Sequence, residues 1–299
     1  MTIKVESLTK IYGSQKALDS ISFEAHKGEI LGFLGPNGAG KSTTMKILTG
    51  YIPGTSGKAF INGNEINENS IAIRKEVGYL PELNPLYTDM YVKEYLVFIA
   101  NTYGLKQNAN EAAESMITKT GLTAERNKKI GQLSKGYKQR VGLAAAMIHN
   151  PSVLILDEPT SGLDPNQVTE IRHLIKEISK DKTVILSSHI MQEVEAMCNR
   201  VVIINKGKIV ADNTIEKLQQ ALSKEFIIDV EFKNNPSPSE LQAIDKAFKI
   251  STTKNGFTIR AAYDAREKIA QQAAQNNWLV LSMHLEESSL EEVFQSLTK

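Results

Sequence analysis

Cysteine is almost absent from this sequence, which has 299 residues and one cysteine, Cys198. A single cysteine cannot form an intrachain disulfide, so a disulfide-stabilised secreted fold is excluded. An excess of charge of one sign is also absent, because 35 Lys and Arg residues oppose 34 Asp and Glu residues. The composition therefore favours neither a basic nucleic-acid surface nor an acidic tail, and we expect no nucleic-acid partner.

Long hydrophobic runs are missing too, although 41% of the residues are hydrophobic. The longest apolar stretches, around Val153–Leu156 and Ala144–Ile148, fall far short of the ~20 residues that a membrane-spanning helix needs. The N-terminus carries Lys4 and Glu6 and lacks the apolar core of a signal peptide. We therefore expect a cytoplasmic chain that does not cross a bilayer by itself.

The pattern along the chain predicts an α/β fold with two domains. Strands are expected at Thr2–Glu6 and Leu18–Ala25, separated by a polar turn, and later apolar strands alternate with helices in the rhythm of a parallel sheet. Residues 84–150 carry long helical patterns and predict a helical insertion. From residue 224 the pattern restarts in the order β-α-β-β-α-β, which is typical of a ferredoxin-like module. We predict a first domain over residues 1–218 and a small α+β domain over residues 224–299.

A glycine-rich motif carries the clearest chemistry. Residues 35–42 match G-x-x-x-x-G-K-[ST] between an apolar strand and a helix. Backbone amides of such a loop close around phosphate oxygens, and the helix N-terminus adds partial positive charge. Lys41 would reach the β- and γ-phosphates, and Ser42 would offer its hydroxyl to Mg²⁺; the alternative is a chance glycine turn. The predicted phosphate-binding residues are Gly35, Pro36, Asn37, Gly38, Ala39, Gly40, Lys41, Ser42 and Thr43.

Two adjacent carboxylates, Asp157 and Glu158, end the apolar strand that begins at Val153. Buried carboxylates need a cationic or hydrogen-bonding partner, and a metal ion is a natural one. Asp157 would hold Mg²⁺ from outside its inner ligand sphere, and Glu158 would polarise the attacking water as a general base. The alternative is that both acids cap the following helix.

Further motifs carry a resemblance to a known family. Residues 133–140 read Leu-Ser-Lys-Gly-Tyr-Lys-Gln-Arg, residues 157–164 read Asp-Glu-Pro-Thr-Ser-Gly-Leu-Asp, and His189 follows the next strand. Over residues 1–218 this set resembles the ATP-binding subunit of an ABC transporter. Residues 78–87 and the C-terminal module look most like the gliding-motility type of ABC system.

This resemblance implies a P-loop NTPase fold of the ABC ATPase type. It implies a chain that binds and hydrolyses ATP with Mg²⁺, forms a head-to-tail dimer with a second, identical ATPase subunit, and powers a separate integral-membrane transporter subunit. The chain would then lie at the inner face of the cell membrane.

Individual roles follow from the resemblance. Tyr12 would stack on adenine, and the alternative is a surface tyrosine in a loop. Ser134 and Gly136 would start the signature helix and contact the ATP of the other subunit, whereas the alternative is an ordinary capped helix. Asp164 would lie in the loop that crosses the dimer interface, and His189 would contact the γ-phosphate unless it is structural.

The sequence departs from the family pattern at the signature and at Glu82. Lys135 and Tyr137 replace the usual glycine and glutamine of the signature, which leaves the strength of the contact across the dimer open. Glu82 stands where the family has a glutamine that binds Mg²⁺ and links the site to the membrane partner. A carboxylate can still bind the ion, and the alternative is that Glu82 is displaced and solvated.

Three functions stay open at this stage. The first is the transporter ATPase, which would dock on its partner through Leu83, Leu86, Tyr87 and Tyr91, although packing of the helical insertion explains these positions as well. The second is a soluble ABC-type ATPase that acts on nucleic acid or the ribosome, and the third is a nucleotide-sensing module with little turnover.

Overall fold

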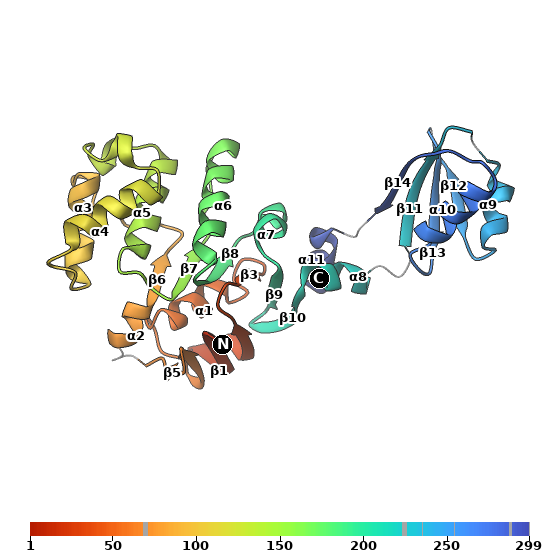
Figure 1. The fold of residues 1–299 in the computed structure, drawn as a ribbon. Helices are drawn as coiled ribbons and strands as arrows, with labels where there is room; N and C mark the ends of the chain where they lie inside the picture. The colour runs from red at the N-terminus through yellow and green to blue at the C-terminus, as the bar shows by residue number, and fades with distance from the viewer. Residues whose placement is uncertain (68–70, 223–225, 235, 254, 287–288, 299) are drawn as a thin grey trace. The chain divides into compact units, whose positions relative to one another are not determined.

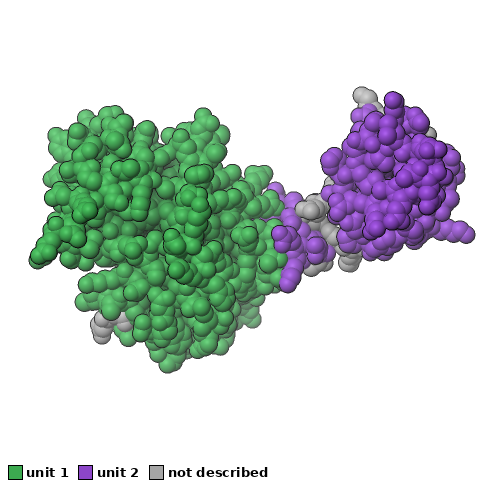
Figure 2. Space-filling view, in the orientation of Figure 1, with its two compact units in different colours: residues 1–215, 297–299 green, residues 216–296 purple. Residues whose placement is uncertain are grey.

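The computed structural model describes residues 1–67, 71–222, 226–234, 236–253, 255–286 and 289–298. Residues 1–215 with 297–299 form unit 1 and residues 216–296 form unit 2, and Figure 2 colours the two units separately. The domain boundary predicted between residues 218 and 224 falls just beyond this division. Across the described ranges, we find no helix with the length and apolar character that a membrane span requires.

An antiparallel sheet opens unit 1, with the strand order β2-β1-β4-β5. Instead of the two short strands predicted, β1 and β2 form a long hairpin. Bulges make this possible: Ser7 and Ser20 adopt φ of 47° and 55°, and the strand register shifts beside them. Their amides are satisfied by side chains, since Ser7 N donates to Ser22 Oγ (2.8 Å) and Ser20 N donates to Thr9 Oγ1 (3.0 Å). The strands are β1 (Ile3–Tyr12), β2 (Gln15–Ala25), β4 (Ser56–Ile61) and β5 (Asn64–Glu65).

A six-stranded sheet forms the centre of unit 1, with the order β10-β9-β3-β8-β7-β6. The strands from β9 to β6 run parallel, and β10 pairs antiparallel with β9. Every residue of β3, β7 and β8 is buried, as expected for strands covered on both faces. The strands are β3 (Ile30–Leu34), β6 (Val77–Leu80), β7 (Val153–Asp157), β8 (Thr183–Ser187), β9 (Arg200–Asn205) and β10 (Lys208–Thr214).

Helix α1 (Lys41–Leu48) is fixed by the core that both sheets share. Its buried residues Met45 and Leu48 belong to one apolar cluster with Val5 of β1, Phe33 of β3 and Ile155 of β7. This packing holds the start of α1 close to the end of β3. The other helices that flank the two sheets are α2 (Ile71–Glu76), α6 (Pro165–Ser179) and α7 (Met191–Met197), and α8 (Ile215–Leu222) follows β10 in the chain.

A helical block interrupts the sheet between β6 and β7, within the predicted range of 84–150. Figure 1 shows α3, α4 and α5 gathered together. They have an apolar cluster of their own, which includes Leu96, Ile117 and Val141. The elements of the block are α3 (Val92–Thr102), α4 (Ala109–Lys119), α5 (Lys135–Met147) and two 3₁₀ turns at Thr123–Glu125 and Ile130–Gln132.

Unit 2 contains an antiparallel sheet with the order β12-β13-β11-β14. Its elements follow the order β-α-β-β-α-β of a ferredoxin-like module. Leu241 of α9 and Ile269 of α10 pack with Ile228, Val230 and Ile259 on one face of the sheet. The elements are β11 (Phe226–Phe232), α9 (Pro238–Ile244), β12 (Lys249–Thr252), β13 (Phe257–Ala261), α10 (Arg266–Gln275) and β14 (Val280–Glu286), and α11 (Leu290–Thr298) follows them.

Candidate functional site

The carboxyl ends of four parallel strands bring most of the predicted site to one edge of the sheet. The glycine-rich loop follows β3, and Glu82 lies just after β6. Asp157 ends β7 and pairs directly with Ser187, the last residue of β8. Because ligands of open α/β sheets bind beyond these strand ends, the geometry marks this edge as the candidate site.

The loop from Gly35 to Gly40 is shaped by its glycines. Gly38 and Gly40 adopt φ of 77° and 118°, a region that other residues rarely enter. A Cβ atom on Gly40 would also lie 2.7 Å from the carbonyl oxygen of Ala17. The loop therefore depends on glycine for its conformation and for the close approach of β2.

Lys41 places its ammonium group inside this loop. Its Nζ donates to the carbonyl oxygens of Gly35 (2.6 Å) and Pro36 (3.2 Å). Burial lowers the pKa of Lys41, and the carboxylates of Glu158, Asp157 and Glu82 oppose that shift. A buried cation is thus held among acidic groups at the position where a phosphate would enter.

A cavity of about 310 Å³ opens at the N-terminus of α1. Backbone amides at a helix N-terminus lack intrahelical partners and favour an anion. The exposed hydroxyl-bearing residue Ser42 and the half-exposed ring of Tyr12 both border this space. The hydrogen-bond donors that line this cavity suit the phosphates of a nucleotide. Its lining residues are Tyr12, Gln15, Ala17, Asn37, Gly38, Gly40, Lys41, Ser42 and Thr43.

The two adjacent carboxylates have different surroundings. Asp157 is 5% exposed and accepts a hydrogen bond from Ser187 Oγ. Glu158 adopts φ of 51°, and its amide donates to the carbonyl oxygen of Ser187 (3.2 Å). Its Oε2 lies 2.7 Å from Nδ1 of His189, which is largely exposed. Burial raises the pKa of Glu158 and the hydrogen bond with His189 opposes the shift, so Glu158 is a stronger base than a solvated carboxylate.

Glu82 is exposed. Burial, together with the charges of Asp157 and Glu82, raises the pKa of Tyr79 to about 12. Glu82 is therefore within electrostatic range of both Tyr79 and Lys41. This position is compatible with a metal ligand and with the solvated alternative.

Ser134, Gly136 and Asp164 form a second group, apart from the residues that line the nucleotide cavity. Ser134 Oγ accepts from Tyr137 N (3.4 Å) and caps α5, which is compatible with both roles considered for it. Asp164 Oδ1 accepts from Gln167 N (3.0 Å) and caps α6. The two capped helix starts are neighbours. Gly136 is in the first turn of α5 and Gln167 in the first turn of α6, and a Cβ atom on Gly136 would lie 2.5 Å from the carboxamide carbon of Gln167.

Comparison with known proteins decides the family. A family model described as ABC transporter matches residues 18–161. The bacitracin transport ATP-binding protein BcrA of Bacillus licheniformis is 34% identical over 99% of this chain and 96% of its own length. This chain belongs to the ABC transporter ATP-binding proteins. The linearmycin resistance ATP-binding protein LnrL of Bacillus subtilis is 32% identical over 99% of this chain and 98% of its own length.

Solved structures agree with this assignment. An ATP-binding subunit of an ABC transporter superposes with a TM-score of 0.68 at 29% identity, covering 75% of this chain and 94% of the other. The bacterial ABC transporter cassette MJ0796, solved as a dimer, superposes with a TM-score of 0.65 at 25% identity, covering 71% of this chain and 98% of the other. The fold is that of an ABC ATPase, as predicted, and the chain binds and hydrolyses ATP.

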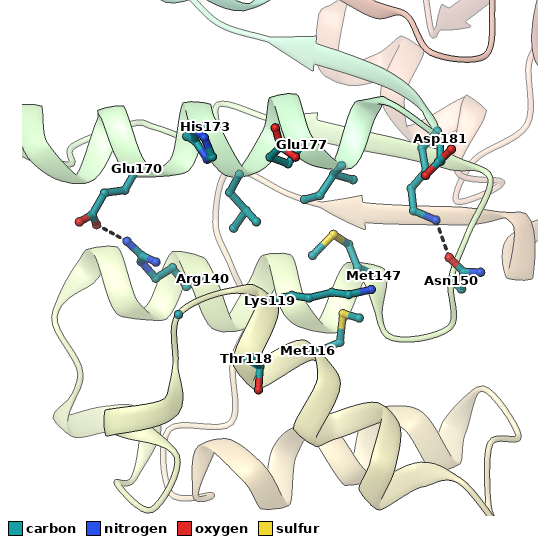
Figure 3. Close-up of a pocket in the computed structure, with 14 residues that line it drawn as sticks. Met116, Thr118, Lys119, Arg140, Met147, Asn150, Glu170, His173, Glu177 and Asp181 are labelled. Carbon is teal, nitrogen blue, oxygen red and sulfur yellow. Dashed lines mark hydrogen bonds and ion pairs between the residues drawn. The ribbon is translucent and has the colours of Figure 1, made fainter.

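A second cleft of this ABC ATPase, of about 580 Å³, lies between α6 and the helical block (Figure 3). Apolar residues such as Met147 and charged residues such as Lys119 and Glu177 line it together, and the predicted site residues do not line it. Arg140 of α5 donates to Glu170 of α6, and Lys182 donates to Asn150 Oδ1 (2.7 Å). The Arg140–Glu170 pair ties the signature helix to the helix that Asp164 caps.

Sequence reasoning missed four polar residues that support the carboxylates of this ABC ATPase. They are the buried residues Thr160, Ser187, Ser188 and Glu193. Ser187 donates a hydrogen bond to Asp157, and Thr160 and Ser188 both donate to Glu193. The two serines at positions 187 and 188, which follow the apolar run Val184–Leu186 of β8, were the available signal.

Proposed function

We propose that this chain binds MgATP at the edge formed by β3, β7 and β8 and drives a separate membrane subunit through ATP-dependent dimerisation. The observation that supports this function most directly is that Lys41, Asp157 and the Glu158–His189 pair lie at one edge of the sheet, where the charges of Asp157 and Glu158 act on Lys41. A phosphate-binding cation, a metal-binding carboxylate and a general base are the groups that phosphoryl transfer to water requires.

Each residue has a distinct task in this proposal. The loop amides and Lys41 hold the β- and γ-phosphates, and Tyr12 stacks on the base. The Ser42 hydroxyl would hold Mg²⁺, with Glu82 as a further oxygen donor and Asp157 acting from outside the inner ligand sphere, and the ion would neutralise charge on the phosphates. Glu158 accepts a proton from the attacking water, and His189 orients Glu158 and contacts the γ-phosphate.

The second group of residues completes the site of another subunit. Ser134 and Gly136 present the N-terminus of α5, whose amides favour an anion. In a head-to-tail dimer these amides would face the ATP on the partner's loop, and Asp164 would lie at the interface between the subunits. A related cassette forms a dimer, which supports this arrangement.

The surface at the helical block is suited to the membrane partner. Leu83, Tyr87, Tyr91 and Phe98 are exposed although they are large and apolar or aromatic. Tyr87 packs against Tyr95 and Phe98, so the patch is preformed. Exposed apolar clusters mark interaction sites, and docking here would hold the chain at the inner face of the membrane.

The names of two full-length relatives concern bacitracin transport and linearmycin resistance. We take transport of an antibiotic as the first substrate class to test. The gliding-motility type stays a prediction that these relatives do not test.

A phosphate-release assay tests the catalytic assignment. Wild-type protein should hydrolyse ATP, and Glu158→Gln should lower turnover by about 10²–10⁴-fold, the usual contribution of a general base. Glu111→Gln is the matched control, because it makes the same chemical change on the exposed face of α4. A wild-type chain that binds ATP without releasing phosphate would contradict the catalytic assignment. Copurification from membranes, followed by identification of the partner, tests the transporter role against the nucleic-acid and ribosome alternative.

A further inference from the structure

Glu193 is a buried carboxylate on α7 that the proposed ATPase reaction does not use. It is 2% exposed. Its Oε2 accepts hydrogen bonds from Thr160 Oγ1 and from Ser188 Oγ, the latter at 3.1 Å. Arg172 lies further away, with Nη2 at 3.9 Å from Oε1. Because burying a carboxylate is unfavourable unless it is well bonded, this arrangement calls for an explanation.

The two hydroxyl donors belong to the two segments that carry the proposed hydrolytic pair. Thr160 lies two residues after Glu158, and Ser188 immediately precedes His189. Thr160 is 2% exposed and Ser188 is 1% exposed, so both hydroxyls are fixed inside the protein. One carboxylate oxygen therefore joins the segment after β7 to the segment after β8.

Two neighbouring serines at the end of β8 donate hydrogen bonds to different carboxylates. Ser187 Oγ donates to Asp157, whereas Ser188 Oγ donates to Glu193. Glu158 lies between these two anchoring points with φ of 51°. A non-glycine residue keeps such a backbone conformation when its surroundings determine it firmly, and the bonds to Thr160 and Ser188 supply part of that support.

We propose that Glu193 is a positioning residue for ATP hydrolysis. It holds the two segments so that Glu158 Oε2 and His189 Nδ1 stay 2.7 Å apart, and it does not line the nucleotide cavity. This inference rests on the function proposed above, since it concerns the orientation of the general base. Its specific consequence is that substitutions of Glu193 that remove its acceptor oxygen should lower turnover without weakening ATP binding.

Two substitutions of Glu193 separate hydrogen bonding from charge. In Glu193→Gln the amide oxygen has two lone pairs and can accept both hydroxyl bonds. In Glu193→Leu the volume is similar but both hydroxyls lose their acceptor. We expect Glu193→Leu to lower kcat by about 10²-fold, as misplacement of a catalytic group by about 1 Å does, with the ATP KM and ATP affinity within about twofold of wild type. Glu193→Gln should keep kcat within about threefold, because the positions of both segments are retained.

A control substitution on the same helix separates a loss of stability from a loss of turnover. Val194 is fully buried beside Glu193, and Val194→Ala removes methyl groups without removing a hydrogen bond. This control should lower the thermal midpoint and leave kcat at temperatures below the transition unchanged. If Glu193→Leu does not fold, Thr160→Val and Ser188→Ala remove the two donors separately, and the double variant should show the turnover defect.

The outcomes distinguish this inference from the proposed function. A wild-type chain without ATPase activity would overturn both. An active wild type whose Glu193→Leu variant, or whose Thr160→Val/Ser188→Ala variant, retains kcat would overturn the inference alone. So would a parallel loss of kcat and ATP affinity, or a Glu193→Gln variant as defective as Glu193→Leu, because either result would mean that Glu193 does not act by positioning through its acceptor oxygen.

Discussion

Replacing Lys41 with alanine removes the ammonium group that the phosphate loop encloses. In wild type this group donates to the carbonyl oxygens of Gly35 and Pro36. An ammonium has three N–H donors in all. The structure therefore leaves one donor that can bond a phosphate oxygen without breaking a contact inside the loop.

The size of the effect follows from that donor. A hydrogen bond to a charged group contributes about 1.5–3 kcal/mol, which corresponds to roughly 10- to 150-fold in Kd. We expect the Kd for ATP to rise in Lys41→Ala by a factor within this range or larger. The larger factor would apply if, in wild type, a phosphate displaces the loop carbonyls and takes further hydrogen bonds from Lys41. The loop amides remain, so residual weak binding should persist.

Isothermal titration with MgATP measures this change. Lys46→Ala is the matched control, because Lys46 is an exposed lysine on the same helix. The control should bind ATP like wild type, and thermal unfolding without nucleotide should verify that both variants are folded. Undiminished ATP affinity in a folded Lys41→Ala variant would refute the assignment of the phosphate loop.

Two further predictions concern Glu82 and the domain division. Glu82→Gln should weaken the Mg²⁺ dependence of the ATPase rate and ease metal-free ATP binding, because it removes a negative charge beside the phosphates; superimposable Mg²⁺ titrations with equal metal-free affinity would place Glu82 outside the metal site. Deleting residues 224–299 should leave a folded ATPase, since the apolar clusters of unit 1 are built from residues before this segment. This deletion also removes the bond from Asn205 Nδ2 to Thr298 O (3.3 Å), and a truncated chain without a cooperative unfolding transition would contradict independent folding.

The phosphate loop could be predicted from sequence because its requirements are local. The positive φ at Gly38 and Gly40 and the place of Lys41 at the start of α1 are set within a few residues. The apolar strand that leads to Asp157 could be predicted equally well. Every residue of β7 is buried, so the sequence shows an uninterrupted apolar run up to Asp157. Both features are therefore visible in the order of residue types alone.

Other features depend on contacts between distant segments. The bond from Thr160 to Glu193 joins residues 33 positions apart, and nothing in the local pattern of α7 indicates which side chains face it. The length of β1 was also missed, because the polar residues near Ser7 resemble a turn until the bulge and the partner Ser22 are known. Sequence periodicity does not contain this information, since it comes from pairing between strands.

In the proposed cycle, nucleotide holds two copies of this chain together and is then hydrolysed. Sedimentation velocity of Glu158→Gln tests it most directly, because this variant should bind ATP without consuming it. We predict monomers without nucleotide, dimers with saturating MgATP, and monomers again when ATP is replaced by ADP. Monomers alone at saturating MgATP, with ATP binding verified in the same sample, would refute ATP-dependent dimerisation.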